Sequence, residues 1–207
     1  MVVQERTGRL NSEQKEFLGI AQRNVDRLAR LINDILDFQK LESGRTDLGT
    51  QENDINEIVR EIIETMTSLA NEKGLNLITQ LDDTVPKIKC DKDKIIQVLT
   101  NIVNNAIKFT ERGSITIATA ADDNIAQVSV SDTGPGIKKE DLPKVFNEFE
   151  QLAGGGDRRT GGSGLGLAIS RKIIEKHNGK IWAESEYGKG ATFHFIVPVE
   201  ERRSKGG

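Results

Sequence analysis

The 207-residue chain has few of the residues that build metal sites or covalent cross-links. Cys90 is its only cysteine, which excludes an internal disulfide and a cysteine-based metal site. His177 and His194 are its only histidines, too few for a His-rich metal site. Because cysteine is so scarce, a reducing, cytoplasmic setting fits the sequence.

Long apolar runs and a charge excess of either sign are lacking as well. No stretch approaches the roughly 20 apolar residues of a membrane span, and the first residues turn polar at once, unlike a signal peptide. The chain has 29 basic and 32 acidic residues, a net charge of -3. Binders of nucleic acid or of anionic membranes carry a basic excess. We therefore expect no nucleic-acid partner and no direct membrane insertion.

The apolar residues that are present are periodic. The pattern predicts one long helix over residues 11–42, with Asn11 as its cap and Gln14 as the reciprocal capping partner. Six apolar positions, alternately three and four residues apart, form a heptad seam: Leu18, Ala21, Val25, Leu28, Ile32 and Ile35. Other apolar residues widen this stripe, which predicts a helix of a bundle.

The rest of the chain mixes strands with helices. Residues 43–53 are polar and predict a domain boundary, and a capped helix begins at Asp54 and ends at Gly74. Further helices are predicted over 93–109 and 167–176, and strands over 75–78, 114–119, 125–131, 180–184 and 192–197. This order indicates one α/β domain behind a helical N-terminal piece.

One predicted helix carries an unusual polar face. Asparagine is a mediocre helix former, yet three occur within residues 101–105. Asn101, Asn105 and Lys108 share one side of this helix, and aliphatic residues cover the opposite side. An amide oxygen suits magnesium and a lysine suits phosphate, but an ordinary solvated face would look the same.

Asp132 stands at the end of a predicted strand, before a Gly-Pro-Gly turn. Alternation places its side chain on the core face, with Val128 and Val130. A carboxylate there accepts hydrogen bonds only, and an adenine amino group would supply the donor that guanine lacks at that edge. The alternative is an aspartate that caps the turn.

Seven glycines fall between Gly154 and Gly166, and the run stops where an apolar helix begins. Such a loop presents backbone N–H groups and a positive helix end to phosphate, with Arg158 and Arg159 close by. The two common phosphate motifs are absent, because no G-x-G-x-x-G occurs and Gly162 stands where the P-loop needs lysine. A flexible linker is the alternative reading.

Taken in order, these segments resemble the sequence boxes of sensor histidine kinases. Residues 101–110 resemble their asparagine box, 132–137 their first glycine box, 145–151 their phenylalanine box and 161–167 their second glycine box, and 188–193 match the end of the pattern. The resemblance runs from about residue 8 to 199.

The resemblance implies an α+β fold. Residues 47–200 would form a two-layer α/β sandwich, with a mixed sheet packed on helices. This is the Bergerat-type ATP-binding fold shared with gyrase, the ninety-kilodalton heat-shock chaperone and MutL. Residues 1–46 would supply the second helix of the dimerisation and phosphoacceptor hairpin, and 201–207 a tail. The first helix of that hairpin, with its acceptor histidine, is absent from the sequence.

The resemblance also implies roles for single residues. Asn105 would bind magnesium, Asn101 and Lys108 the phosphates of ATP, and Asp132 the adenine amino group, with Thr192 nearby through water. Residues 152–166 would be a lid anchored by Phe146 and Phe149. The remaining expected nucleotide contacts are Phe109, Gly134, Gly136, Ile137, Arg158, Arg159, Gly162, Ser163, Gly164, Leu165, Gly166 and Leu167.

The implied activity is that of a protein-histidine kinase, which passes the γ-phosphoryl group of magnesium-ATP to a histidine on a helix that this chain lacks. The implied partners are that phosphoacceptor helix, a response regulator receiver domain and a second copy bound through residues 11–42. ATP-hydrolysing relatives carry a glutamate base at the position of Asn101, so the sequence favours transfer over hydrolysis. An ATP hydrolase of the same fold and a non-catalytic assembly module remain as alternatives.

Overall fold

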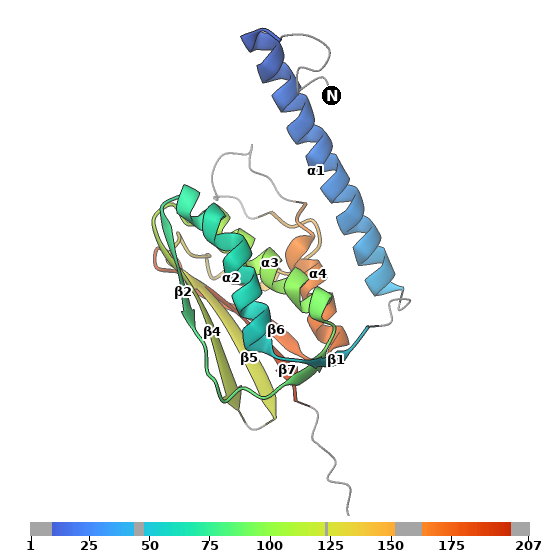
Figure 1. The fold of residues 1–207 in the computed structure, drawn as a ribbon, viewed down its shortest axis with the longest axis vertical. Helices are drawn as coiled ribbons and strands as arrows, with labels where there is room; N and C mark the ends of the chain where they lie inside the picture. Colours follow the sequence, from blue (N-terminus) through green and yellow to red (C-terminus); the bar gives the residue numbers. More distant parts are fainter. Residues whose placement is uncertain (1–9, 44–47, 123, 152–162, 200–207) are drawn as a thin grey trace, which may run out of the picture.

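The computed structural model describes residues 10–43, 48–122, 124–151 and 163–199. In the described part, a long helix leads into a two-layer sandwich in which three helices cover one face of a sheet (Figure 1). This arrangement confirms the predicted α+β sandwich preceded by a long helix. None of the described helices has the length and apolar character needed to cross a bilayer.

The first helix, α1 (Ser12–Glu42), begins at the predicted capping box. The Asn11 side chain accepts from the Gln14 N–H at 2.8 Å, and the Gln14 side chain accepts from the Asn11 N–H at 3.0 Å. Near its C-terminal end α1 packs on the sandwich through buried Phe38 and Leu41, and it contacts α4 there. The other end extends away from the sandwich (Figure 1).

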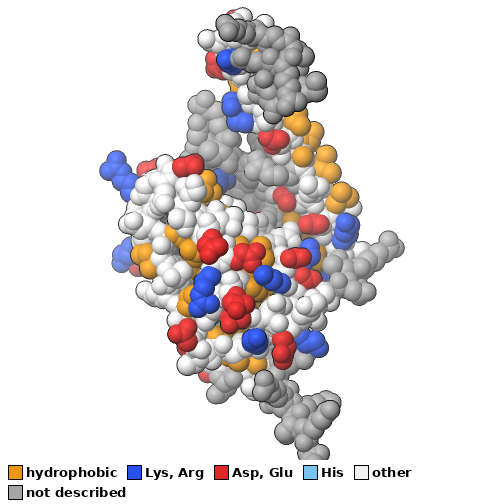
Figure 2. Space-filling model, in the orientation of Figure 1, with side chains coloured by type: hydrophobic (Ala, Val, Ile, Leu, Met, Phe, Trp, Pro, Cys, Tyr) orange, Lys and Arg blue, Asp and Glu red, His pale blue; other side chains and the backbone are white. Residues whose placement is uncertain are grey.

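Among the described residues, nothing therefore covers the predicted heptad seam along most of α1. Val25 is 64% exposed and Leu28 57%, and Ile32 and Ile35 are exposed as well. Figure 2 shows the hydrophobic side chains that follow the outer side of this helix. Apolar surface of this extent on one helix face is typical of an interaction site.

The sandwich pairs a five-stranded sheet with three helices. The helices are α2 (Ile55–Glu72), α3 (Lys92–Phe109) and α4 (Gly166–Lys176). The strands are β2 (Leu75–Gln80), β4 (Gly113–Asp122), β5 (Ile125–Asp132), β6 (Lys180–Glu186) and β7 (Gly190–Pro198). Their order is β2-β4-β5-β7-β6, in which the β2–β4 pair is parallel and the other pairs are antiparallel.

Three short elements escaped prediction from the sequence. Strand β1 (Gln51–Asn53) pairs with β3 (Ile88–Cys90), and the 3-10 helix η1 spans Leu142–Lys144. Each has three residues, which is too short for any period to be recognised.

The core lies between the helices and one face of the sheet. Alternate residues of the central strands, among them Ile117, Val130 and Phe195, are buried against the helices. The residues between them, such as Ser129 and His194, lie on the opposite face, where Ser129 Oγ is 2.8 Å from His194 Nδ1. This alternation fixes which strand residues can reach the helix side.

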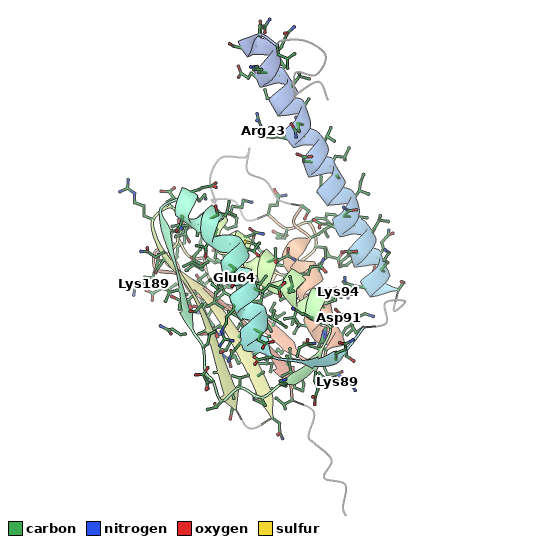
Figure 3. The ribbon with its side chains drawn as sticks, in the orientation of Figure 1. Arg23, Glu64, Lys89, Asp91, Lys94 and Lys189 are labelled. Atoms are coloured by element: carbon green, nitrogen blue, oxygen red, sulfur yellow. The ribbon has the colours of Figure 1, made fainter. Side chains whose placement is uncertain are left out.

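A buried histidine holds two helix ends together. The His177 Nε2 atom, at the end of α4, accepts from the Asp91 N–H at 3.0 Å, and Nδ1 lies 2.8 Å from the Ile173 carbonyl oxygen. Asp91 in turn caps α3 by accepting from the Lys94 N–H, and it accepts from the Gly49 N–H of the segment after α1. Asp91 and Lys94 are labelled in Figure 3. These bonds fix the start of α3.

Ile117 tests this account of the core. Ile117 is fully buried under the helices, so we expect Ile117→Ala to lower the free energy of unfolding by about 2–5 kcal/mol through lost burial and a new cavity. The matched control is Ile78→Ala, because Ile78 is 41% exposed. Urea unfolding measures both variants, and equal losses would contradict the assigned core face.

Candidate functional site

The predicted site residues gather around the C-terminal half of α3, which lies between the start of α4 and the loop after β5. In the middle of the helix, the Asn101 side chain donates to the carbonyl oxygen of the first residue of α4, Gly166. At its C-terminal end, the Phe109 carbonyl oxygen lies against Gly134, two residues after Asp132. One helix therefore spans both halves of the site.

The polar face of α3 is as predicted. Ile102, Val103 and Ala106 are buried, while Asn105 and Lys108 are only partly buried. The Lys108 ammonium lies 4.8 Å from the centre of the Phe109 ring. No group of three His, Cys, Asp or Glu side chains that could hold a metal occurs among the described residues. An amide oxygen from Asn105, joined by phosphate oxygens of a ligand, is a suitable donor set for magnesium.

Lys73, which the sequence reasoning missed, holds the C-terminal end of α3. Its ammonium donates to the Ile107 carbonyl oxygen at 2.8 Å and to the Lys108 carbonyl oxygen at 3.1 Å. These carbonyls belong to the last turn of the helix, where a cation is favourable. No pattern in the sequence could have found this contact, because it joins residues 34 and 35 positions apart.

Asp132 ends β5 as a partly buried carboxylate. Its Oδ1 accepts from the Gly134 N–H at 2.8 Å. Burial raises the pKa of Asp132, and hydrogen bonds from the Gly134 and Ala191 N–H groups oppose that rise. A carboxylate has about four acceptor sites, so room remains for a donor from a ligand.

The turn after Asp132 is shaped by Gly136, which has a φ of +69°. A Cβ at this position would also collide with the Glu186 carbonyl oxygen, so only glycine fits. The next residue, Ile137, donates its N–H to Ser185 Oγ at 2.7 Å. The turn is therefore anchored to β6 and holds Asp132 in place.

Thr192 is placed differently from the expectation. In the ladder, Asp132 pairs with Ala191 and Thr192 pairs with Ser131, so Thr192 faces the side of the sheet opposite to Asp132. There its Oγ1 lies 2.9 Å from Ser131 Oγ. The expected water contact beside Asp132 is wrong for Thr192, because strand parity turns its hydroxyl away and gives that position to Ala191.

The start of α4 lies beside Asn101. The N-cap residue Leu165 supplies no side-chain bond to the first N–H groups of the helix. Asn101 donates its amide hydrogens to the Gly166 carbonyl oxygen at 3.0 Å and to Ser170 Oγ at 3.3 Å. These bonds tie α3 to α4 and leave Asn101 with no amide hydrogen for a phosphate. In this structure Asn101 positions α4, a role that differs from the expected phosphate contact.

The loop before α4 is held at Gly164 and Phe149. Gly164 has a φ of +73°, and its carbonyl oxygen accepts from the Phe149 N–H at 3.0 Å. Phe146 is buried edge-on against Phe193, with ring centres 6.2 Å apart, whereas Phe149 is 64% exposed. Ser163 Oγ accepts from the Leu165 N–H at 3.1 Å. Arg158, Arg159, Gly162 and most of the expected lid lie outside the described residues.

Comparison with known proteins places the same segments in one family. Residues 90–201, more than half of the chain, match the family described as histidine kinase-, DNA gyrase B-, and HSP90-like ATPase. Residues 2–44 match the His Kinase A (phospho-acceptor) domain. The hybrid signal transduction histidine kinase L of Dictyostelium discoideum is 39% identical over 199 residues, which make up 93% of this chain and 12% of that protein.

Solved structures give the same result. Full-length ShkA in complex with AMPPNP superposes with a TM-score of 0.81 at 32% identity, over 94% of this chain and 40% of that one. The histidine kinase ThkA in complex with the response regulator protein TrrA superposes with a TM-score of 0.73 at 28% identity, over 95% of this chain and 55% of that one. The chain thus spans only part of the length of these relatives.

The raised pKa of Asp132 predicts that the site costs stability. The folded chain keeps a proton on Asp132 at pH values, above the ordinary 3.8, where the unfolded chain has released it. The free energy of unfolding from this group therefore falls as the pH rises through that window. We expect Asp132→Asn to unfold at higher urea than the native chain at pH 7, with an advantage that shrinks towards pH 3. Asp83→Asn, at an exposed position, should change stability by less than about 0.5 kcal/mol.

Proposed function

The chain belongs to the histidine kinase-, DNA gyrase B- and HSP90-like ATPase family, and from that membership we propose its reaction: it binds magnesium-ATP and passes the γ-phosphoryl group to a histidine of a phosphoacceptor helix. The observation that carries the proposal is that the C-terminal half of α3 joins two features: a half-buried, acceptor-only Asp132 beside its last residue, and the start of α4 beside Asn101, where the N-cap residue makes no side-chain hydrogen bond. A nucleotide needs an acceptor for its base and N–H donors for its phosphates, and these two features supply them.

In this arrangement each end of the nucleotide meets matching chemistry. Asp132 accepts a hydrogen bond from the adenine amino group, which supports a preference for adenine over guanine. Lys108 and the N–H groups at the start of α4 favour the phosphates. Asn105, between them on α3, would hold magnesium, which supplies charge neutralisation during phosphoryl transfer.

The acceptor is not a histidine of this chain. His177 is 7% exposed and both of its ring nitrogens have partners. His194 stacks on Trp182 in the sheet, with ring centres 5.0 Å apart, on the face opposite to Asp132. A separate helix must therefore present the histidine to the nucleotide.

Transfer is favoured over hydrolysis by Asn101. Hydrolysis needs a base that takes a proton from water, and a neutral amide cannot take it. The Asn101 amide is also committed to α4 through Gly166 and Ser170. The ATP hydrolase reading is therefore the weaker of the two.

Phosphotransfer from labelled ATP tests the proposal. Incubated with magnesium, γ-labelled ATP and a separate hairpin bearing the acceptor histidine, the chain should label the hairpin with acid-labile phosphate and should not label itself. Asn105→Ala should lower the rate at least tenfold, because it removes the proposed magnesium ligand. The matched control is Asn104→Ala, one position away on α3. Label on His177 or His194, or full activity in Asn105→Ala, would contradict these assignments.

We further propose that two copies associate through α1 and that a response regulator receiver domain accepts the phosphoryl group from the acceptor histidine. The match of residues 2–44 to a phospho-acceptor domain supports both, as does the regulator bound to ThkA. The exposed seam at Val25, Leu28 and Ile32 supports the first. Each large aliphatic that a second copy covers contributes about 1.5–3 kcal/mol.

Self-association is checked by light scattering over a concentration series. Leu28→Asp should weaken association at least tenfold, because each copy would then bury a charge in the seam. Asn33→Asp adds the same charge at an exposed position of α1 outside the seam and should leave association unchanged. A native chain that stays monomeric at high concentration would refute association through α1.

A further inference from the structure

Thr110 has a buried hydroxyl that the proposed site leaves unexplained. It is 1% exposed, and its Oγ1 is one of two buried side-chain polar atoms without a hydrogen-bond partner among the described residues. The other is His194 Nε2, on the opposite face of the sheet. A buried hydroxyl without a hydrogen-bond partner lowers the stability of the fold by about 1–3 kcal/mol. An unpaired hydroxyl next to a candidate binding site therefore calls for a functional explanation.

The hydroxyl lies on the same side of Gly134 as the Asp132 carboxylate. Thr110 ends α3, where its N–H donates to the Ala106 carbonyl oxygen at 3.0 Å, so its backbone is fixed. A Cβ added at Gly134 would lie 3.3 Å from Thr110 Oγ1, 2.8 Å from Asp132 Oδ1 and 3.3 Å from the Phe109 carbonyl oxygen. Three oxygen atoms thus surround the position that a side chain at Gly134 would occupy. Of the three, only the Thr110 hydroxyl oxygen carries a hydrogen that it can donate.

We propose that Thr110 is a positioning residue for Asp132: its hydroxyl donates to the carboxylate from the buried side when a nucleotide base covers that carboxylate. The inference rests on the proposed function. A base over Asp132 displaces the water that solvates the carboxylate. The adenine amino group replaces one of the lost donors, and a second donor from the protein offsets more of the loss. In the part of the chain that the structure describes, the Thr110 hydroxyl is a neighbouring donor that has no other hydrogen bond to break.

Two features of the site fit this role. The absence of a side chain at Gly134 keeps the space between the hydroxyl and the carboxylate clear. Thr192, the other hydroxyl expected near Asp132, is bonded to Ser131 on the opposite face, and Ala191 on the Asp132 face has no hydroxyl to offer. Of the Thr110 and Thr192 hydroxyls, that of Thr110 is the one that can donate to Asp132.

The test compares ATP affinity by calorimetry from pH 4.5 to 8 in the native chain, Thr110→Val and Thr110→Ser. At pH 7.5, Thr110→Val should bind ATP about tenfold more weakly, whereas Thr110→Ser should bind like the native chain. A donor to the carboxylate favours its charged form, so without it the pKa of the bound Asp132 rises. Loss of binding on the acid side should therefore begin at higher pH in Thr110→Val.

Controls separate this role from packing and from the proposed function itself. Thr192→Val removes a hydroxyl from the opposite face and should leave affinity and the pH midpoint unchanged. An unshifted pH midpoint in Thr110→Val, or equal losses in the serine and valine variants, would overturn the inference. If Thr110→Val does not fold, Thr110→Cys is tested in its place, because a thiol is a weak donor of similar volume. The pH midpoint of ATP binding must then shift in Thr110→Cys as well. If Asp132→Asn abolishes ATP binding and Thr110→Val leaves it unaltered, the role of Thr110 is refuted and the proposed function stands. If the native chain binds no ATP, the proposed function is refuted as well.

Discussion

The division of α3 into a buried aliphatic side and an exposed amide side is the constraint on which this structure depends. The aliphatic side, with Ile102 and Val103, packs between the sheet and the neighbouring helices and cannot rotate without exposing the core. Because a helix is rigid, fixing one side fixes the other. Asp91 and His177 hold its start, and the Lys73 ammonium holds its end. Asn105 and Lys108 are thereby held in place by the helix that carries them.

The elements around α3 complete the site at some cost to the fold. Asp132 is partly withdrawn from water, and the N-cap residue of α4, Leu165, offers its first N–H groups no side-chain hydrogen bond. Phe149 has a φ of +59°, a backbone conformation that costs a non-glycine residue energy. Such costs are tolerated when the surrounding structure is stable, and they gather where a ligand would relieve them. The well-packed core under α3 supplies that stability.

Much of this organisation follows from periodicity that can be read in the chain. The capping box at Asn11, the seam of α1 and the two faces of α3 each depend on residues three or four apart, and the structure has all three. The error at Thr192 has a different origin. A motif gives the neighbourhood of a residue, but the face of its side chain depends on pairing with a distant strand, and a shift of one residue reverses it. The contacts of Lys73 and the bonds of Asn101 to α4 join distant segments and leave no local pattern in the sequence.

The way α1 is attached has a mechanical consequence. The helix touches the sandwich near one end, through Phe38, Leu41 and a 3.1 Å bond from the Gln97 amide to Asp37. The part before this anchor is roughly 35 Å long at 1.5 Å per residue. It therefore acts as a lever arm: a tilt of about 10° at the anchor moves its far end by roughly 6 Å. A small rotation of the sandwich relative to α1 is therefore equivalent to a large displacement of the helix tip relative to the sandwich.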